Sequence, residues 1–274
     1  MSVINSGSFA KALWPGVNAW YGKAYTEYPV EYTSLFEKHT SSRAWEEDVG
    51  TSGLGLAVQK SEGAPISYDS ERQGFITRYQ HAVFALGFVI TREMMEDDQY
   101  DIVGKRKSEG LAMSMRQTKE IIAANVYNRA FSGSYTGGDG SALLATGHAN
   151  IAGGTWSNKL ATDADLSEAA LEQACIDIAG FTNDRGLLIA VRPETLIIPR
   201  QLMFEAKRIL NSDGRVGTDS NDLNALKTLG VIPKVVTNHY LTDTDAWFIR
   251  TNVKHGMKYC ERRADNFAMD NDVD

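Results

Sequence analysis

The sequence has 274 residues, of which 43% are hydrophobic and 23% charged, a balance typical of a folded globular protein rather than a disordered one. Its formal net charge of −7 disfavours a dedicated nucleic-acid binder, which normally carries a basic domain or stripe. No stretch approaches eighteen apolar residues, so neither a membrane span nor a signal peptide is expected. The two cysteines, Cys175 and Cys260, indicate a reducing cytoplasm rather than a disulfide framework.

The first 40 residues are rich in aromatic side chains and are expected to form an irregular N-terminal arm. Proline and glycine next to Trp14 and near Trp20 interrupt any helical pattern. The side chains of Trp14, Trp20 and Tyr21 need a surface to bury them, and they are the expected contacts of the arm. The sequence leaves open whether that surface belongs to the same chain.

Residues 50–60 suggest a strand, and 61–70 carry the small and polar residues typical of a loop tip. The run 71–93 then leads back from the loop tip as the second arm. Residues 83–90 are apolar on both faces, as expected of a buried strand, whereas 71–81 mix apolar with charged residues. The pattern predicts a hairpin that projects from the body and is rooted at 83–90.

An isolated two-stranded hairpin is marginally stable in water, and its edges invite pairing with another chain. We therefore expect neighbouring subunits to stabilise this one. The expected intersubunit contacts are Gly63, Ala64, Pro65, Ile66, Tyr68, Phe75, Ile76, Arg78 and Tyr79.

The strongest helical signal extends from about residue 98 to 130, which corresponds to about 50 Å at 1.5 Å per residue. Apolar residues recur there at intervals of three and four, a spacing that places them on one face. We expect this face to pack into the core. Its members are Leu111, Met115, Ile122 and Val126, with Thr118 between them.

Residues 132–154 contain seven glycines and no lysine or arginine, so a flexible loop is expected rather than a phosphate-binding one. Beyond this segment, Asp165 is expected to cap a helix that Gly180 ends. Two further apolar runs, 187–191 and 196–198, predict short strands. The buried helix faces expected in this region comprise Leu171, Ala174, Cys175 and Ile178, followed by Leu202, Ala206, Ile209 and Leu210.

A short helix near 223–229 and strands near 235–236 and 246–249 complete the pattern. Helices and strands mix without strict alternation, which indicates the α+β class.

No catalytic or metal-binding constellation emerges from the sequence. The five histidines show no pair at metal-ligand spacing and are expected on surfaces or in turns. The acidic groups at 243–245 and 270–274 lack the glycine and terminal glutamate of a calcium loop. We therefore expect no catalytic residue, cofactor or metal.

Four blocks of sequence occur in a characteristic order. They are TREMMEDDQYDIVGKRKSEGLAMSMRQTKEIIAANVYNRAF (91–131), DGSALLATGHAN (139–150), GGTWSN (153–158) and LLIAVRPETLIIPRQLMFEAKRIL (187–210). In this order and spacing the chain resembles the major head subunit family of Mu-like and related tailed phages.

The resemblance implies the Hong Kong 97-like phage capsid fold, an α+β fold with an arm, an extended β-hairpin loop, a long spine helix, and peripheral and axial domains. On this template the arm is 1–40 and the extended loop is 41–95. The spine helix and peripheral domain, with the glycine-rich loop, occupy 96–159, and the axial domain occupies 160–250. Residues 251–274 return to the peripheral domain and end in an acidic tail.

The implied function is structural and not enzymatic: a major capsid subunit that self-assembles into an icosahedral shell enclosing phage double-stranded DNA. The implied partners are copies of itself in hexamers and pentamers, a separate scaffolding protein, a portal and a cement or decoration protein. The DNA is enclosed without sequence-specific binding, and no membrane is involved. The implied location is the virion, after assembly in the cytoplasm of a bacterial host.

Two departures from the family pattern are expected. No heptad-containing scaffolding region precedes the arm, and the C-terminal end is shorter than in similar chains. Lys60 borders the loop, but no acid–asparagine pair matches it, so no covalent crosslink is expected. Two alternatives remain open: another ring- or tube-forming virion component, or an α+β enzyme that uses Asp184, Arg185 and His148.

Overall fold

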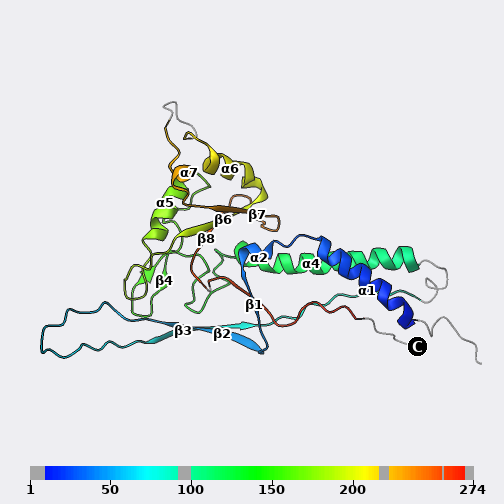
Figure 1. Cartoon of the computed structure of the whole chain (residues 1–274), viewed down its shortest axis with the longest axis horizontal. Helices are drawn as coiled ribbons and strands as arrows, with labels where there is room; N and C mark the ends of the chain where they lie inside the picture. The colour runs from blue at the N-terminus through cyan, green and yellow to red at the C-terminus, as the bar shows by residue number, and fades with distance from the viewer. Residues whose placement is uncertain (1–9, 92–99, 216–221, 255, 269–274) are drawn as a thin grey trace, which may run out of the picture. The chain divides into compact units, whose positions relative to one another are not determined.

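The structure is a computed structural model that describes residues 10–91, 100–215, 222–254 and 256–268 (Figure 1). The chain forms two compact units. One comprises the described residues of 1–42, 81–123 and 259–274, and the other comprises 43–80 and 124–258. The acidic tail expected at the C-terminal end lies outside the described residues from position 269 onward.

The first unit contains α1 (Ala10–Glu27), α2 (Tyr32–Leu35), a π-helical turn η2 (Tyr100–Gly104) and most of α4 (Lys105–Asn128). Strand β1 (Glu37–Thr40) pairs with β9 (Lys258–Glu261). The core of this unit joins α1 to α4. It consists of Tyr21, Ala24, Leu111 and Ala112, with Tyr25, Phe88, Met115 and Phe267 packed against it.

The expectation of an irregular arm is wrong, because α1 runs through Pro15. Val17, Tyr21 and Ala24 are buried at helical spacing, which gives the helix an apolar face. Pro15 lies in the second turn, where its missing N–H removes one backbone hydrogen bond. Burial of the following turns outweighs this loss, since most helical stability in proteins comes from packing.

Helix α4 is where the sequence predicts a long helix, but its buried face differs from the predicted one. Leu111 is buried, whereas Ile122 is half-buried and Val126 is 40% exposed. The buried positions include Arg116 and Glu120, which are 9% and 1% exposed. The α-helical part has 24 residues, about 36 Å at 1.5 Å per residue. Residues 98 and 99 of the predicted span lie outside the described residues.

Both buried charged side chains have partners on distant segments. These partners explain why the buried face of α4 differs from the predicted one. The guanidinium of Arg116 lies 4.1 Å from the centre of the Tyr25 ring and donates to the Tyr25 carbonyl oxygen at 3.1 Å. The carboxylate of Glu120 accepts the backbone N–H groups of Glu31 and Tyr32 at 3.1 and 2.8 Å. A buried charge is tolerated when it is hydrogen-bonded in this way.

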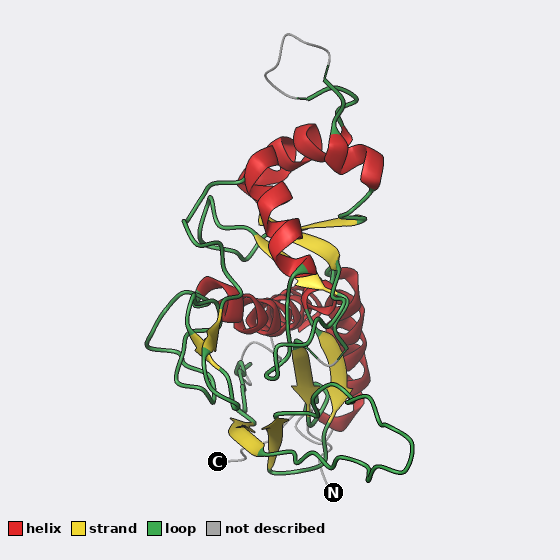
Figure 2. Cartoon of the chain, turned by 90° about the vertical axis from the view of Figure 1, so that its left-hand side faces the viewer, coloured by secondary structure: helices red, strands yellow, loops and turns green. Residues whose placement is uncertain are grey.

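The second unit contains a three-stranded sheet with β6 (Pro193–Pro199) in the middle. Strand β7 (Lys234–Asn238) pairs with it in parallel, and β8 (Phe248–Thr251) pairs with it antiparallel. The helices of this region are α5 (Glu168–Ala179), η3 (Arg200–Leu202), α6 (Met203–Asn211) and α7 (Ala225–Leu229). Figures 1 and 2 show these helices gathered beside the sheet.

The core of this unit lies between the sheet and these helices. Its buried members are Leu166, Leu171, Leu196, Ile198, Ala206, Ile209, Leu210, Leu226 and Ile232, with Cys175 and Leu202 partly buried against them. The helix faces that the sequence predicts are therefore largely confirmed. The mixture of helices and a mixed sheet also confirms the α+β class.

Two local expectations in this region are wrong. The N-cap of α5 is Ser167, whose hydroxyl accepts the Ala170 N–H at 3.2 Å, and not Asp165. Residues 187–191 do not form a strand, and their one described ladder contact is an isolated bridge between Thr182 and Leu188. The chain makes a turn there, with Gly186 at a φ of +78°, a left-handed conformation that favours glycine. The expected ending of α5 at Gly180 is confirmed.

The hairpin pairs β2 (Trp45–Thr51) with β3 (Gln73–Gln80), so the expected strand positions at 50–60 and 83–90 are wrong. The register places Val49 opposite Ile76, with an irregularity between Val49 and Thr51. Residues 81–91 have no regular secondary structure. A second small ladder joins β4 (His148–Ala149) to β5 (Thr155–Trp156) within the glycine-rich region. Among the described helices, none combines the length and the apolar character that crossing a membrane requires.

Candidate assembly surface

The stem of the hairpin, formed by the paired strands β2 and β3, is anchored within the second unit by close packing at two glycines. A Cβ added to Gly74 would lie 2.1 Å from the Cδ1 atom of Ile151, and one added to Gly138 would lie 2.4 Å from the Thr77 hydroxyl. The Lys258 ammonium also lies 2.8 Å from a carboxylate oxygen of Asp48 on β2. Contacts this close leave room only for glycine, so the stem has a defined position on its own unit.

Side chains across the two stem strands reinforce the pairing. The Nε atom of Arg78 donates to Glu47 Oε1 at 2.6 Å, and the same guanidinium lies 4.9 Å from the centre of the Trp45 ring. These three side chains are at least partly exposed, so each contact contributes modestly to the stability of the isolated chain.

Beyond the stem, hydrogen bonds between the two arms of the hairpin become sparse. Ser52 and Arg72 exchange two hydrogen bonds at 3.0 Å, one of them through the Ser52 hydroxyl. The tip is a turn in which the Ala64 N–H donates to the Ser61 carbonyl oxygen at 3.1 Å. Gly63 has a φ of +78° at the third position, which is the pattern of a type II turn.

The expected intersubunit residues on this hairpin are exposed in the isolated chain, apart from Ala64, which is half-buried. Tyr68 is 93% exposed and Ile66 is 65% exposed, both beyond the paired stem. Phe75, Ile76 and Tyr79 are exposed on β3. Within the described residues, 14 of the 32 exposed large apolar side chains lie between positions 45 and 90. Exposed apolar side chains are therefore concentrated in this stretch of the sequence, and such side chains are candidates for an interaction site.

The expected arm contacts have different surroundings. Tyr21 is buried within its own unit, where its ring stacks on Phe267 with centroids 4.6 Å apart. The surface that covers Tyr21 therefore belongs to the same chain. Trp20 is half-buried, and the side chain of Trp14 lies outside what the structure describes.

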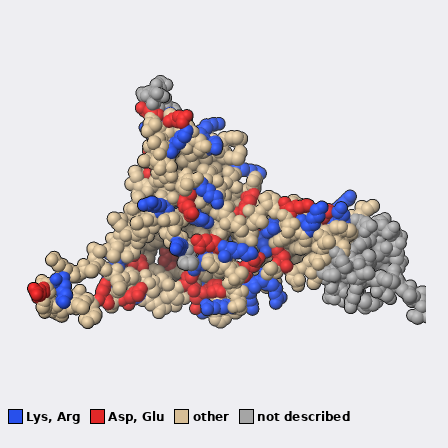
Figure 3. All heavy atoms as spheres, viewed as in Figure 1, with Lys and Arg blue, Asp and Glu red and all other residues tan. Residues whose placement is uncertain are grey.

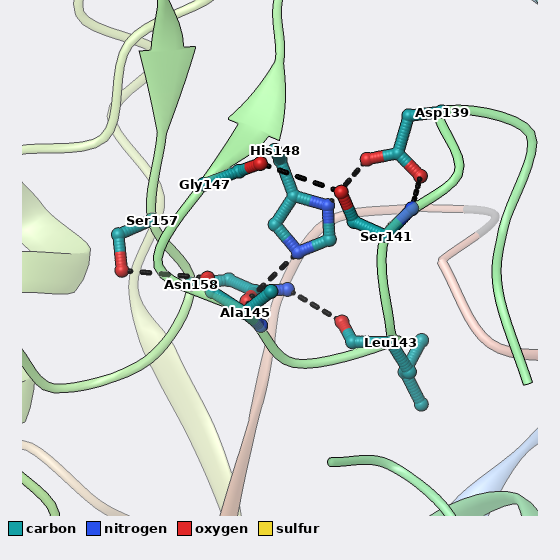
Figure 4. A network of polar contacts seen from close by, with 8 residues as sticks. All are labelled: Asp139, Ser141, Leu143, Ala145, Gly147, His148, Ser157 and Asn158. Carbon is teal, nitrogen blue, oxygen red and sulfur yellow. Dashed lines mark hydrogen bonds and ion pairs between the residues drawn. The ribbon is translucent and has the colours of Figure 1, made fainter. Parts of the chain in front are cut away.

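The glycine-rich region is organised around a buried histidine, although the sequence predicts His148 on a surface or in a turn. His148 is 7% exposed. Its Nδ1 atom lies 2.6 Å from Asp139 Oδ2, and its Nε2 atom lies 3.1 Å from Asn158 Oδ1 (Figure 4). The histidine ring also stacks on Trp156 with centroids 4.8 Å apart.

The amide of Asn158 has one possible orientation in this network. Its oxygen accepts the Ala145 backbone N–H at 2.9 Å, and its nitrogen donates to the Leu143 carbonyl oxygen at 2.8 Å (Figure 4). The Nε2 atom of His148 is therefore a donor to Asn158 Oδ1. Sequence patterns did not reveal this network, because its members are separated by glycine-rich turns without periodicity.

Asp139 completes the network as an acceptor. Although burial raises its pKa, hydrogen bonds from His148 and from the Ser141 N–H outweigh that effect and lower the pKa of Asp139 below its ordinary value. The arrangement links several loop segments through the side chains of Asp139, His148 and Asn158.

Two residues of the enzyme alternative, His148 and Arg185, contact different partners. His148 contacts Asp139, and Arg185 pairs with Asp69 at 2.8 Å. Among the described contacts, none connects His148 with Asp184 or Arg185. The described residues also contain no group of three or more histidine, cysteine or acidic side chains able to hold a metal ion.

Charged side chains of both signs are interspersed on the face shown in Figure 3. No large basic block is visible there. This mixed distribution matches the acidic overall composition and does not resemble a dedicated nucleic-acid-binding surface.

The family model for "Phage capsid protein" matches residues 75–270, more than two thirds of the sequence. This chain belongs to the phage capsid protein family. It is a structural subunit of a phage head, and it is a component of the virion. No curated protein matches it.

Solved structures of the bacteriophage JBD30 head resemble this fold. The procapsid chain gives a TM-score of 0.55 at 14% identity, covering 84% of this chain and 99% of that one. A chain of the JBD30 capsid gives a TM-score of 0.59 at 13% identity, covering 78% and 92%. A chain of the JBD30 capsid decorated with minor capsid protein trimers gives a TM-score of 0.55 at 14% identity, covering 78% of this chain and 92% of that one. At these identities the likeness concerns the fold.

Proposed function

We propose that this phage capsid protein is the major head subunit of a tailed phage or prophage of the Mu-like group, with the Hong Kong 97-type architecture. Its copies assemble as hexamers and pentamers into an icosahedral shell around double-stranded DNA. The observation that carries the proposal is the long hairpin, whose stem is fixed on its own unit while its outer part presents uncovered apolar side chains.

In this proposal the hairpin lies across an adjacent subunit. Large assembly interfaces bury thousands of Å², and burial of apolar surface contributes about 25 cal/mol per Å² before the costs of association and ordering. Ile66 and Tyr68 at the tip, and Phe75, Ile76 and Tyr79 on β3, supply such surface. Repetition of individually weak contacts around a closed shell then gives a stable particle.

The division of the chain into capsid regions is part of the same proposal. The spine helix corresponds to α4, and the axial domain contains the three-stranded sheet with α5, α6 and α7. The proposed regions are 1–40 (arm), 41–95 (extended loop), 96–159 (spine helix and peripheral domain), 160–250 (axial domain) and 251–274 (return to the peripheral domain).

The proposed partners follow from this role. They are a separate scaffolding protein, a portal and a cement or decoration protein, and assembly takes place in the cytoplasm of the bacterial host. The JBD30 capsid with its minor capsid protein trimers provides a precedent for decoration of this fold. The enclosed DNA needs no sequence-specific contact, which is compatible with the acidic composition.

The test compares the purified wild-type chain with two variants by size-exclusion chromatography and negative-stain electron microscopy. Ile66→Asp places a charge on the hairpin tip. Ile176→Asp is the matched control, because Ile176 on α5 is also 65% exposed. We expect closed polyhedral particles from the wild type and the control, and unassembled subunits from Ile66→Asp.

Stacked rings or tubes from the wild type would instead indicate another kind of virion component. A small monodisperse particle at all concentrations would contradict the shell proposal and favour the enzyme alternative. Equal assembly of Ile66→Asp and the wild type would show that the tip is not a contact.

A further inference from the structure

The outer part of the hairpin, residues 52–72, is held by the carboxylate of Asp69. One oxygen, Oδ2, accepts the N–H of Gly55 from the opposite arm at 2.8 Å. The other oxygen, Oδ1, accepts the N–H of Ser70 at 2.8 Å and also lies 2.8 Å from Nη2 of Arg185. A single side chain therefore joins the two arms to each other and to a loop 116 positions away.

Arg185 is presented to this carboxylate by a tight turn. The side-chain oxygen of Asn183 accepts the N–H groups of Arg185 and Leu187 at 3.0 and 2.9 Å. The Asn183 N–H donates to the Leu187 carbonyl oxygen at 2.8 Å, and Gly186 supplies the left-handed residue of the turn. This turn fixes the backbone from which the Arg185 side chain extends.

The guanidinium makes a second contact with the hairpin. Its Nη2 atom also donates to the Ser70 carbonyl oxygen at 3.1 Å. Arg185 thus contacts both the side chain of Asp69 and the backbone of the next residue. Both residues belong to the same compact unit.

The hairpin has fewer restraints beyond this point. Between residues 56 and 68, the turn closed by Ala64 and Ser61 provides the one described backbone hydrogen bond. The exposed apolar side chains of Leu56, Val58, Ile66 and Tyr68 all lie in this segment. The contact of Asp69 with Gly55 is therefore the outermost described contact between the two arms.

We propose that the Asp69–Arg185 pair is a latch within the subunit that orders the outer hairpin before assembly, so that a second copy of the chain captures a preformed arm. The inference rests on the proposed function of the hairpin as an intersubunit contact. Ordering a loop during association costs free energy, and a segment that is already ordered in the free subunit avoids part of this cost. The latch lowers the concentration at which subunits begin to assemble.

The latch is sensitive to ionic strength, because both side chains remain partly accessible to solvent. The Arg185 side chain is 30% exposed and that of Asp69 is 46% exposed. Exposed pairs are screened by salt, and removal of one such pair shifts an equilibrium by up to about fivefold. High salt should therefore reproduce the effect of removing Arg185.

The experiment uses the full chain with Arg185→Ala, with Arg185→Lys as the conservative variant and Arg72→Ala as the matched control. Arg72 is an exposed arginine of the same hairpin. Amide hydrogen exchange of residues 52–72 is measured in unassembled subunits at low concentration. Light scattering then gives the concentration at which particles begin to form, and electron microscopy confirms their shape.

We expect Arg185→Ala to accelerate exchange in 52–72 and to raise the assembly concentration by about two- to fivefold at low salt. Arg185→Lys should fall between Arg185→Ala and the wild type, and Arg72→Ala should match the wild type. The difference should shrink in about 0.5 M salt, where the screening length is below 10 Å.

Unchanged exchange in Arg185→Ala would overturn the latch, as would an unchanged or lower assembly concentration. A wild-type chain that forms no particles would instead remove the proposed function on which the latch depends. The two failures are therefore distinguishable.

Discussion

The ammonium of Lys119 on α4 lies 2.9 Å from Oε1 of Glu261 on β9. Lys119 also lies 2.9 Å from Asp265, and Lys38 pairs with the other oxygen of Glu261. These side chains connect helix α4, strand β1 and the C-terminal segment of one compact unit. Burial alone would lower the pKa of Lys119, but hydrogen bonds with Glu261 and Asp265 raise it well above its usual range. Lys119 is therefore the central cation of this cluster.

Removal of this cation should destabilise the subunit. We expect Lys119→Met to lower the free energy of unfolding by about 2–3 kcal/mol, because it leaves two carboxylates without their shared partner. Lys23→Met is the control, since Lys23 and its partner Glu27 are strongly exposed and should contribute less than about 0.5 kcal/mol. Denaturant unfolding of unassembled subunits measures both. Equal effects of the two substitutions would contradict a central role for Lys119.

Gly74 should not tolerate a methyl group, because the added Cβ would lie 2.1 Å from Ile151. We expect Gly74→Ala to lower the free energy of unfolding by about 1–3 kcal/mol through overpacking. The double variant with Ile151→Ala should lose less than the sum of the two single effects, since it removes the clash. Gly22→Ala in α1 is the control, because nothing lies within 4 Å of its added Cβ, and it should stabilise the chain by about 0.5–1 kcal/mol. Thermal unfolding curves compare the four variants with the wild type, and additive single effects would argue against the contact.

The Asp139–His148 contact should contribute to the acid sensitivity of the subunit. The folded-state pKa of Asp139 lies below its ordinary value of 3.8, so its contribution is present above that pH and is lost as pH falls through the folded pKa. We expect Asp139→Asn to lower stability by about 1–2 kcal/mol at pH 7 and to reduce the loss of stability below about pH 4.

Unfolding free energies between pH 7 and pH 3 test this expectation. Asp163→Asn is the control, because the Asp163 side chain is 77% exposed in its pair with Lys159. If Asp139→Asn and the wild type lose the same stability on acidification, Asp139 does not carry the pH dependence.

Periodicity predicted the helices that bury a simple apolar face. Ala206, Ile209 and Leu210 on α6 are buried as expected, because their spacing alone places them against the sheet. The buried face of α4 was not predictable in this way. Arg116 and Glu120 are buried because Tyr25 and the backbone of Glu31 and Tyr32 provide partners about 90 positions away, and no local pattern contains that information.

The positions of the hairpin strands were likewise not predictable from local sequence patterns. β2 contains Trp45 and Val49 among acidic residues, with little alternation to indicate a strand, whereas the apolar run 83–90 remains largely exposed in the isolated chain. The paired strands also pack against Gly138 and Ile151, which are distant in the sequence. The sequence pattern of 61–70 did predict the position of the loop tip, and the structure places a turn there between Ser61 and Ala64.

The central claim is that a neighbouring copy of the chain covers the hairpin tip. It is tested most directly by placing a photoreactive benzophenone amino acid at Tyr68, which is 93% exposed in the isolated chain. Illumination of assembled particles should produce covalently linked dimers, whereas illumination of dilute unassembled subunits should not. Particles that form normally but give no linkage between chains at this position would contradict the account.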